Sequence, residues 1–529
     1  MTYPEELQFK MKNVTYKSVE NELKSMRMDC SAGYDHFSMS YIKPVIDELV
    51  SPLTHIINES IEYNTFPQQW KIGKISPIPK TSNSTEPDEF RPISILPIFS
   101  KIFERLIAKQ ICDYIERTCI YKNTMSGFRR SHSTSTLLLK IRDDILEAMK
   151  KGELSLAIFS DYSKAFDTVS YSTILKKLNK VGFGKDSLLL MTNYLTNRQQ
   201  FVQVDDKTST YGSCNFGVPQ GSVLGPILFN LYVSDLQDND TGPVCQYADD
   251  TTQYNHFKLN KLNSSVKHLE DRLSLLNDWS VENNLLFNKS KTKSMLFASS
   301  RMYQLHDLNK PDLFKITINN GSIERVSNWK VLGVMFDENL TWDCQLNVLI
   351  KSCFGKLAVL RKLKRYTSFI NRKRLAESLI LSKLDYCNVL YTGLTQVSLK
   401  RMQRVLNSTA AFVTGHYCCQ EDVIKLVWLP IKERITCNTL KFVHKSLYDE
   451  NFPQYLKVEF KNDLRTLRGS EDIYKLEYYV DNGTFRGTAS VLFNNLPYDI
   501  RSEKDYNIYS RKLKEYLLDC SLASYISSH

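Results

Sequence analysis

Residues 154–169 read Leu-Ser-Leu-Ala-Ile-Phe-Ser-Asp-Tyr-Ser-Lys-Ala-Phe-Asp-Thr-Val, and this stretch does most to decide the fold. Its first seven residues form an apolar run with the length of a buried strand, and the run stops at Asp161. A helical pattern follows from Tyr171 to Val181. We therefore expect Asp161 to lie where a strand ends.

A second acidic feature lies farther along the chain, at Asp249 and Asp250. The residues before it, 244–247, and after it, 251–254, are rich in strand-forming types, which predicts a hairpin with both acids at its turn. Such a tip exposes two carboxylates. A single Asp-Asp pair in a turn is most often just a turn, so the pair alone carries little weight.

Asp161 and the Asp249-Asp250 pair are distant in sequence and can meet only through tertiary folding. Three carboxylates packed together repel one another unless a cation lies between them. Two divalent ions about 3.5 to 4 Å apart can activate a 3′ hydroxyl and stabilise the charge that develops on a triphosphate. Magnesium suits this task, because it prefers hard oxygen ligands and keeps several waters. Convergence of the three carboxylates would therefore predict a metal site.

The composition is that of an ordinary globular protein, with 42% hydrophobic and 24% charged residues in a chain of 529. This length predicts several subdomains. The sequence contains no apolar run of about 18 residues and no secretory signal pattern, so we expect a protein that works inside the cell without a membrane span. The twelve cysteines include no C-x-x-C pair, and the close pair Cys418-Cys419 reads as two reduced thiols, so no zinc site is expected.

The net charge of +11 is concentrated in one segment. Residues 351–410 contain thirteen Lys or Arg against two acidic residues, and the rest of the chain is balanced. A localised basic excess is typical of a surface that follows phosphates, although a solvated helix face would explain it about as often.

Two amphipathic helices follow from the periodicity of apolar residues. Leu269, Leu273, Leu276 and Trp279 recur at helical spacing and indicate a core-facing stripe that ends near Asn283. A second stripe indicates a helix capped at its C-terminus by Gly415; its members are Leu399, Met402, Val405, Leu406 and Phe412.

Three blocks in this order resemble the reverse transcriptases of non-long-terminal-repeat retrotransposons, in the jockey-like and related clades. They are residues 159–169 around Asp161, residues 217–226 (Gly-Val-Pro-Gln-Gly-Ser-Val-Leu-Gly-Pro) and residues 247–250 (Tyr-Ala-Asp-Asp). Further matching blocks are 31–35, 70–80, 90–107, 126–134, 288–292 and 332–342, with looser matches at 384–387 and 493–497. The departures are small: Met125 stands where the family commonly has Gln, and Ser160 replaces an apolar residue.

The resemblance implies an α+β right-hand polymerase fold with fingers, a palm built on an antiparallel sheet, a helical thumb and an α-rich C-terminal domain. We expect an N-terminal helical entry region over 1–65, fingers and palm over 66–298, a β-rich primer-grip junction over 299–345, a basic helical thumb over 346–415 and a C-terminal domain over 416–529. The endonuclease that usually precedes the polymerase blocks in this family is absent, so we expect a missing N-terminal region or another protein to supply it.

By motif position, Asp161, Asp249 and Asp250 would hold two Mg²⁺ ions, or Mn²⁺ as a substitute, and the Tyr162 carbonyl would be a further ligand. The implied nucleotide-binding residues are Phe166 as a gate against a 2′ hydroxyl, Gln220 and Gly221 in a turn, Arg91 and Lys80 on the triphosphate, and Lys291 near the departing pyrophosphate. A glycine lets the backbone approach a base or sugar closely, and Arg can pair with phosphate bidentately.

Leu332, Gly333 and Val334 resemble a primer-gripping hairpin, although a glycine within a strand can also mark a bulge. Nucleic-acid contacts are expected from the basic thumb residues Arg361, Lys362, Lys364, Arg365, Arg372, Lys373 and Arg374. Shape and backbone contacts suit this role, because an A-form-like duplex offers little base readout.

The implied activity is RNA-directed DNA polymerisation during target-primed reverse transcription. The implied partners are an RNA template, a DNA primer or nicked target DNA, and deoxynucleotides, in the nucleus and cytoplasm. Two alternatives stay open. One is another branch of RNA-templated polymerase, such as an intron maturase or a telomerase-like enzyme. The other is a domesticated relic that binds nucleic acid without catalysis.

Overall fold

The computed structural model describes residues 5–238, 244–318, 321–417, 420–461, 474–477, 479 and 483–528. These residues form helices and strands in two compact units that interleave in sequence, which confirms the α+β class. Unit 1 comprises Met1–Phe128, Asp161–Pro243 and Arg272–Asn288, and unit 2 comprises Arg129–Ser160, Val244–Asp271 and Lys289–His529. Among the described helices, none combines the length and the apolar character needed to cross a bilayer.

Unit 1 joins a helical layer to a small sheet. Its helices are α1 (Tyr16–Ser25), α2 (Met39–Ile42), α3 (Ile46–Glu62), α4 (Ile98–Arg117), α6 (Tyr171–Lys180), α7 (Lys185–Leu195) and α8 (Leu224–Tyr232). Its strands are β1 (Ile72–Pro79), β2 (Phe90–Ile95), β4 (Tyr162–Ser163), β5 (Arg198–Val204), β6 (Lys207–Thr208), β7 (Gly212–Cys214) and β10 (Leu286–Phe287). The helix predicted from Tyr171 is therefore confirmed.

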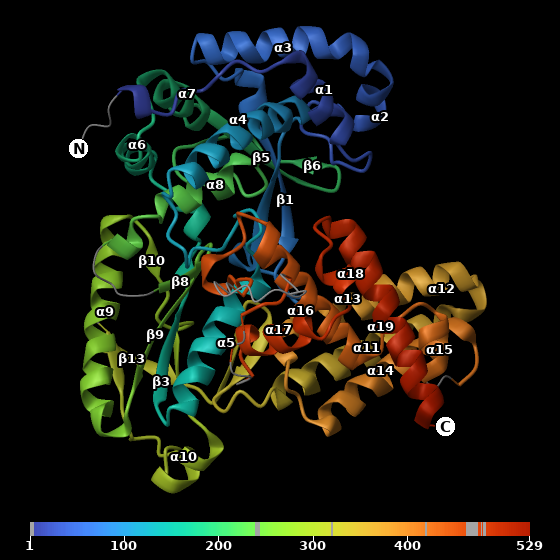
Figure 1. Cartoon of the computed structure of the whole chain (residues 1–529). Coiled ribbons are helices and arrows are strands. Elements are labelled where there is room, and N and C mark those ends of the chain that lie inside the picture. Colours follow the sequence, from blue (N-terminus) through green and yellow to red (C-terminus); the bar gives the residue numbers. More distant parts are fainter. Residues whose placement is uncertain are drawn as a thin grey trace, which may run out of the picture. The chain divides into compact units, whose positions relative to one another are not determined.

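Packing in unit 1 depends in part on aromatic side chains from α4, from α7 and from the segment after α3. The helix α1 packs against α3 and α4 (Figure 1). Phe66 stacks on Phe103 with ring centroids 4.9 Å apart, and Tyr194 meets Phe66 edge-on. The sheet has the order β2-β1-β5-β6, with β7 also paired to β5. In it β1 runs antiparallel to β2 and parallel to β5, so β1 is an interior strand.

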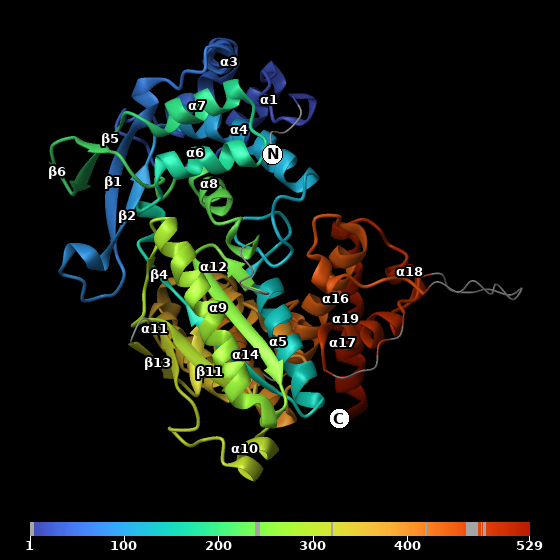
Figure 2. The same ribbon diagram turned by 90° about the vertical axis from the view of Figure 1, so that its left-hand side faces the viewer.

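Unit 2 is built on a six-stranded sheet with the order β12-β13-β11-β3-β9-β8. The strands are β3 (Leu154–Ser160), β8 (Val244–Tyr247), β9 (Asp250–Phe257), β11 (Lys293–Phe297), β12 (Ile316–Ile318) and β13 (Gly321–Arg325). All seven residues of β3 are buried, as expected for an apolar run in the middle of a sheet, and the predicted strand 154–160 is confirmed. The helix α5 (Thr134–Lys150) contacts β3, β8 and β9 and lies along the sheet (Figures 1 and 2).

A short hairpin and a group of helices complete unit 2. The hairpin pairs β14 (Asn328–Val331) with β15 (Val334–Asp337). The helices are α10 (Ser300–His306), α11 (Asp343–Leu363), α12 (Phe369–Ala376), α13 (Ser382–Asp385), α14 (Gln396–Thr414), α15 (Gln420–Lys425), α16 (Ile431–Tyr448), α17 (Phe485–Asn494), α18 (Tyr498–Arg501) and α19 (Tyr506–Ser528). The predicted cap at Gly415 is confirmed, because its φ of +100° is left-handed. Cys418 and Cys419 lie outside the described residues.

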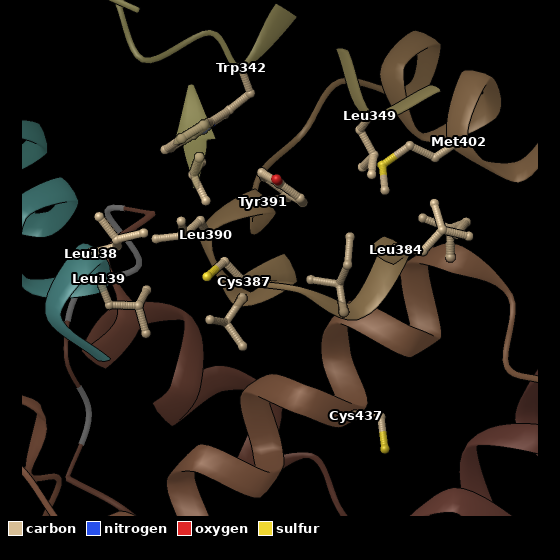
Figure 3. Packing of buried hydrophobic residues seen from close by; sticks show 14 of the residues in the cluster. Leu138, Leu139, Trp342, Leu349, Leu384, Cys387, Leu390, Tyr391, Met402 and Cys437 are labelled. Atoms are coloured by element: carbon tan, nitrogen blue, oxygen red, sulfur yellow. The ribbon is translucent and has the colours of Figure 1, made fainter. Parts of the chain in front are cut away.

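One apolar core runs through unit 2. It joins Leu138 and Leu139 of α5 to Met402 of α14, Cys437 of α16 and Leu513 of α19. Figure 3 shows the part of this core in which Trp342, Leu384 and Tyr391 gather. The C-terminal helices therefore share their core with the sheet and with the helices that precede them.

The helix α9 (Leu262–Glu282) begins in unit 2 and ends in unit 1. Its predicted stripe, Leu269, Leu273, Leu276 and Trp279, is buried, so this helix is also confirmed. Asn284, just beyond the helix, adopts a left-handed conformation, and the chain then turns into β10.

Candidate functional site

The predicted acidic hairpin has its turn at Ala248 and Asp249. Ala248 takes a positive φ of 57°, and Tyr247 pairs with Asp250 across the tip, so Asp250 is the first residue of β9 rather than part of the turn. Asp249 is half-buried and Asp250 is exposed. Because Thr251 and Thr252 behind them are buried, the two carboxylates emerge from a well-anchored strand end.

The register of β3 on β9 places the end of β3 beside this tip. Ser160 pairs with Thr251, and Thr251 follows Asp250 directly. The next residue along the chain from Ser160 is Asp161, so the chain leaves the sheet of unit 2 at the end that carries the acidic hairpin. The backbone carbonyl of Asp161 accepts a hydrogen bond of 2.9 Å from the Asn288 N–H.

The three predicted metal ligands are divided between the units, with Asp161 in unit 1 and Asp249 and Asp250 in unit 2. Across the described part of the chain, no group of three or more His, Cys, Asp or Glu side chains is arranged to hold a metal ion. Tyr162, whose carbonyl was the further predicted ligand, is buried in β4 and paired to Phe287 of β10.

Phe166 lies in a single helical turn after β4 and is held between aromatic rings. It stacks on Phe229 of α8 with centroids 4.3 Å apart, and it meets Phe128 nearly edge-on at 6.3 Å. A stacked arrangement fixes the plane of the ring, as a gate against a sugar hydroxyl requires. Phe166 is half-buried.

The loop from Gly217 to Gly221 is bonded to the segment that carries Phe166. The Val218 N–H donates to the Phe166 carbonyl at 2.9 Å, and the Gln220 amide donates to the Asp167 carboxylate at 2.9 Å. Burial raises the pKa of Asp167, while the Gln220 donor lowers it. The Gln220 side chain, predicted to bind a nucleotide, therefore also positions the neighbouring loop.

Gly221 is required by a contact within the chain. Its φ is +123°, and a Cβ there would lie 2.5 Å from the Ser94 carbonyl oxygen of β2. The Ser94 N–H donates to the Gln220 carbonyl at 2.7 Å. The backbone of Gly221 is thus approached closely by the strand β2 of unit 1.

Buried charged groups lie behind this loop. Glu104 of α4 is fully buried and accepts hydrogen bonds from the N–H groups of Val223 (2.7 Å) and Leu224 (3.1 Å) at the start of α8. Burial raises the pKa of Glu104, and the nearby Arg198 cation and these donors counteract that shift. Glu104 therefore anchors the end of the loop that the candidate site uses.

The predicted triphosphate-binding residues Lys80 and Arg91 lie near the two ends of a strand connection that Asp88 organises. The Lys80 ammonium donates to the Asp88 carbonyl at 2.7 Å, and the Asp88 carboxylate forms an ion pair of 2.7 Å with Lys164. That pair holds the pKa of Asp88 below its usual value. Lys80 and Arg91 are both exposed, so their cations can reach a ligand.

Lys291 is exposed in the turn before β11, whereas Lys293 is committed to the fold. Lys293 forms an ion pair of 2.7 Å with Glu324, and its ammonium lies 5.7 Å from the centroid of the Trp329 ring. The Lys293 ammonium is therefore held by contacts within unit 2.

The predicted primer-grip residues form the tip of the β14–β15 hairpin. Leu332 and Gly333 both take positive φ values, 45° and 86°, which makes a two-residue hairpin turn rather than a bulge. The Tyr386 hydroxyl donates to the Leu332 carbonyl at 2.7 Å, and a Cβ on Gly333 would lie 3.2 Å from the same hydroxyl. Tyr386 therefore holds this tip against the following helices.

The basic thumb residues divide into exposed and structural groups. Arg361, Lys362, Arg365 and Arg374 are exposed, and Lys373 is half-buried. Arg372 donates to the carbonyls of Val413 and Thr367, and Lys364 donates to the Gly415 carbonyl, so these two cations also hold the end of α14. Tyr366 and Phe369 are exposed among the basic residues.

Sequence reasoning assigned no role to three residues that hold segments of the structure in place: Glu104, Tyr386 and Asp337. The Asp337 carboxylate accepts from the N–H groups of Thr341 and Trp342 at 2.8 Å each and closes the loop that starts α11. An acidic residue shortly before a helical pattern is a signal that could have identified Asp337. Glu104 and Tyr386 act on segments far away in sequence, which no local pattern reveals.

Comparison with known proteins gives a consistent result. Residues 78–336 match the family described as "Reverse transcriptase (RNA-dependent DNA polymerase)". The chain is similar to the "Probable RNA-directed DNA polymerase from transposon BS" of Drosophila melanogaster, with 28% identity over 70% of this chain and 41% of that protein. It is also similar to the "RNA-directed DNA polymerase from mobile element jockey" of the same organism, with 28% identity over 67% of this chain and 38% of that protein. The chain thus spans about two fifths of the length of these relatives.

Proposed function

We propose, from the premise that this chain belongs to the reverse transcriptase family through residues 78–336, that it is an RNA-directed DNA polymerase. It would add deoxynucleotides to a 3′ hydroxyl, release pyrophosphate and serve retrotransposon copying by target-primed reverse transcription. The observation that carries this proposal is the register of β3 on β9, which pairs Ser160, the residue before Asp161, with Thr251, the residue after Asp250.

Asp161, Asp249 and Asp250 would hold two magnesium ions, or manganese in their place, together with the Tyr162 carbonyl. The donor set fits such ions, because carboxylate and carbonyl oxygens are the hard ligands that magnesium prefers. When bound, the pair would stabilise the attacking and leaving oxygens of phosphoryl transfer. The protein would contribute by holding Asp161 directly after the buried strand β3, and Asp249 and Asp250 at the tip of the β8–β9 hairpin.

Nucleotide selection would fall to residues of unit 1. The Phe166 ring, fixed by its stack on Phe229, would exclude a 2′ hydroxyl. Gln220 would face the nascent pair from a loop fixed at Ser94. Arg91 and Lys80 would bind triphosphate oxygens, and Lys291 of unit 2 would neutralise departing pyrophosphate.

Primer and duplex binding would fall to unit 2. The tip at Leu332, Gly333 and Val334, held by Tyr386, would contact the primer. The exposed cations of α11 and α12 would contact duplex phosphates, with affinity that falls as salt rises. We propose that the RNA template, primer and deoxynucleotides meet the enzyme in the nucleus and cytoplasm, without a zinc ion or a membrane.

The test is incorporation of labelled deoxynucleotides on a poly(rA)/oligo(dT) template with magnesium. Asp249→Asn should lower incorporation on the order of 10³-fold, because one metal ligand is weakened, and should leave duplex binding intact. Asp312→Asn, at an exposed position outside the candidate site, is the matched control and should retain full activity. Equal activity in Asp249→Asn and the control would contradict the proposal.

A further inference from the structure

A pocket of about 320 Å³ lies in unit 1 beside the Gly217–Gln220 loop. Its lining comes from the turn before β1, from β5 and from the loop with the residues just before it; it includes Lys71, Arg198, Gln199, Asn215, Phe216 and Gln220. This volume is at the small end of ligand sites, so a single nucleotide unit suits it and a duplex does not.

Arg198 gives the pocket its chemical character. The side chain is only 3% exposed, yet within the described residues it forms no ion pair, and the one hydrogen bond that its guanidinium donates goes to the Tyr194 carbonyl at 3.1 Å. A guanidinium carries five N–H donors in a fixed planar arrangement that matches phosphate oxygens. The centroid of the Tyr194 ring lies 5.0 Å from the guanidinium carbon and stabilises the cation in part. A bound anion would supply the ionic partner that this buried cation lacks.

The charged groups near Arg198 do not supply an anionic partner for its guanidinium. Glu104 lies near Arg198, but its carboxylate accepts from the start of α8 instead of pairing with the guanidinium. Asp167, the acidic residue in the lining, accepts from Gln220. Lys71 is buried and adds a second cation, with its ammonium 2.7 Å from the Asn193 side-chain oxygen. Bound phosphate would offset this excess of positive charge.

The entrance of the pocket carries the kinds of side chain that bind a single nucleic-acid strand. Phe216 is 67% exposed and presents a ring on which a base can stack. The exposed amides of Gln199, Gln200 and Asn215 can both donate to and accept from base edges. A deoxynucleoside triphosphate is the weaker fit, because it arrives with metal ions, and Asp167, the one carboxylate in the lining, is held by Gln220.

We propose that this pocket binds the unpaired template strand ahead of the duplex, with a backbone phosphate on Arg198 and a base stacked on Phe216. The inference rests on the proposed polymerase function, which supplies the single-stranded template. It adds a site for the strand that is read, which shares only Gln220 with the residues proposed for the incoming nucleotide.

The experiment measures binding by fluorescence anisotropy, with EDTA present so that no chemistry occurs. The probes are an RNA template annealed to a DNA primer, either with a single-stranded 5′ template overhang or blunt. Phe216→Ala should weaken binding of the overhang probe about tenfold, through loss of one stacked base, and should leave the blunt probe unchanged. The matched control is Tyr211→Ala, which removes an aromatic ring that is 57% exposed and lies outside the pocket lining.

Arg198→Met should weaken the same probe and reduce the slope of log affinity against log salt by about 0.7, the value for one phosphate on a single strand. Arg198→Lys should keep that slope. If Arg198→Met does not fold, Phe216→Ala alone tests the proposal. The Phe216 ring is mostly exposed, so its removal should not disturb the fold.

The proposal is overturned if Phe216→Ala matches Tyr211→Ala, or if overhang and blunt probes weaken equally. It is also overturned if the variants raise KM for deoxynucleotides while overhang binding is unchanged. A chain that prefers the overhang but never incorporates nucleotides would contradict the proposed function and leave this pocket assignment intact.

Discussion

The two units hold their functional segments by different physical means. In unit 1 the loop around Gln220 is fixed by buried polar groups and by a backbone contact that leaves no room for a side chain at Gly221. In unit 2 the acidic hairpin and the β14–β15 tip rest on an apolar core that extends from α5 to α19. Polar substitutions should therefore damage unit 1 most, and apolar truncations should damage unit 2 most.

The largest effect that tests this contrast is expected in the core of unit 2. Leu406→Ala removes a fully buried side chain of α14 and should lower the free energy of unfolding by about 2 to 5 kcal/mol. Leu363→Ala, at a position that is 44% exposed at the end of α11, should change it by less than about 0.5 kcal/mol. Hydrogen exchange of the intact chain measures both, because it reports peptides of α14 and α4 separately. Equal loss of protection in α4 would break the contrast between the units.

A glycine pair gives the next largest effect. Gly221→Ala introduces a Cβ 2.5 Å from the Ser94 carbonyl oxygen at a φ of +123°, so it should destabilise unit 1 by about 2 to 4 kcal/mol. Gly355→Ala places a methyl group in open space on α11 and should stabilise that helix by up to about 1 kcal/mol. Thermal unfolding followed by circular dichroism compares the two variants. A neutral Gly221→Ala would show that β2 and the loop can separate at little cost.

Asp337 is a polar group of unit 2 that holds a loop by hydrogen bonds, as the buried polar groups of unit 1 do. Its removal should therefore have a local effect. Asp337→Ala removes the acceptor for the Thr341 and Trp342 N–H groups and should cost about 1 to 3 kcal/mol. Exchange of the first turn of α11 should rise more than exchange of α14. Asp312→Ala, at an exposed position, is the control and should leave both unchanged. Uniform loss of protection through unit 2 would mean that Asp337 supports the core rather than the helix start.

What the sequence predicts well is what local periodicity determines. The strand ending at Ser160, the helix from Tyr171 and the helix capped by Gly415 follow from patterns within a few residues. The hairpin at Asp249 was also predicted, although Asp250 belongs to the strand.

The contacts that shape the candidate site are non-local, and the sequence did not reveal them. Gly221 meets Ser94 across more than a hundred residues, and Glu104 reaches the start of α8 over a similar separation. The sequence did not decide whether Leu332 and Gly333 form a hairpin turn or a bulge. A glycine within a strand is compatible with both until the pairing of the strand is known, and the pairing of β14 with β15 shows a turn. Tertiary register decides such cases, and local composition does not.

The last expected effect concerns the buried cation Lys71, where unit 1 should lose stability through charge rather than packing. Burial, with the Arg198 cation nearby, lowers the pKa of Lys71 to about 8 from its ordinary value of 10.5. Between these pH values the unfolded chain binds more protons than the folded chain, so stability should rise with pH, by at most about 1.4 kcal/mol per pH unit. Lys71→Met should remove this rise, whereas Lys109→Met, on the exposed face of α4, should keep it. Urea midpoints measured from pH 8 to 10.5 give the difference between wild type and variant. A difference that stays flat, or that falls with pH, would show that the Lys71 ammonium is not penalised by its surroundings.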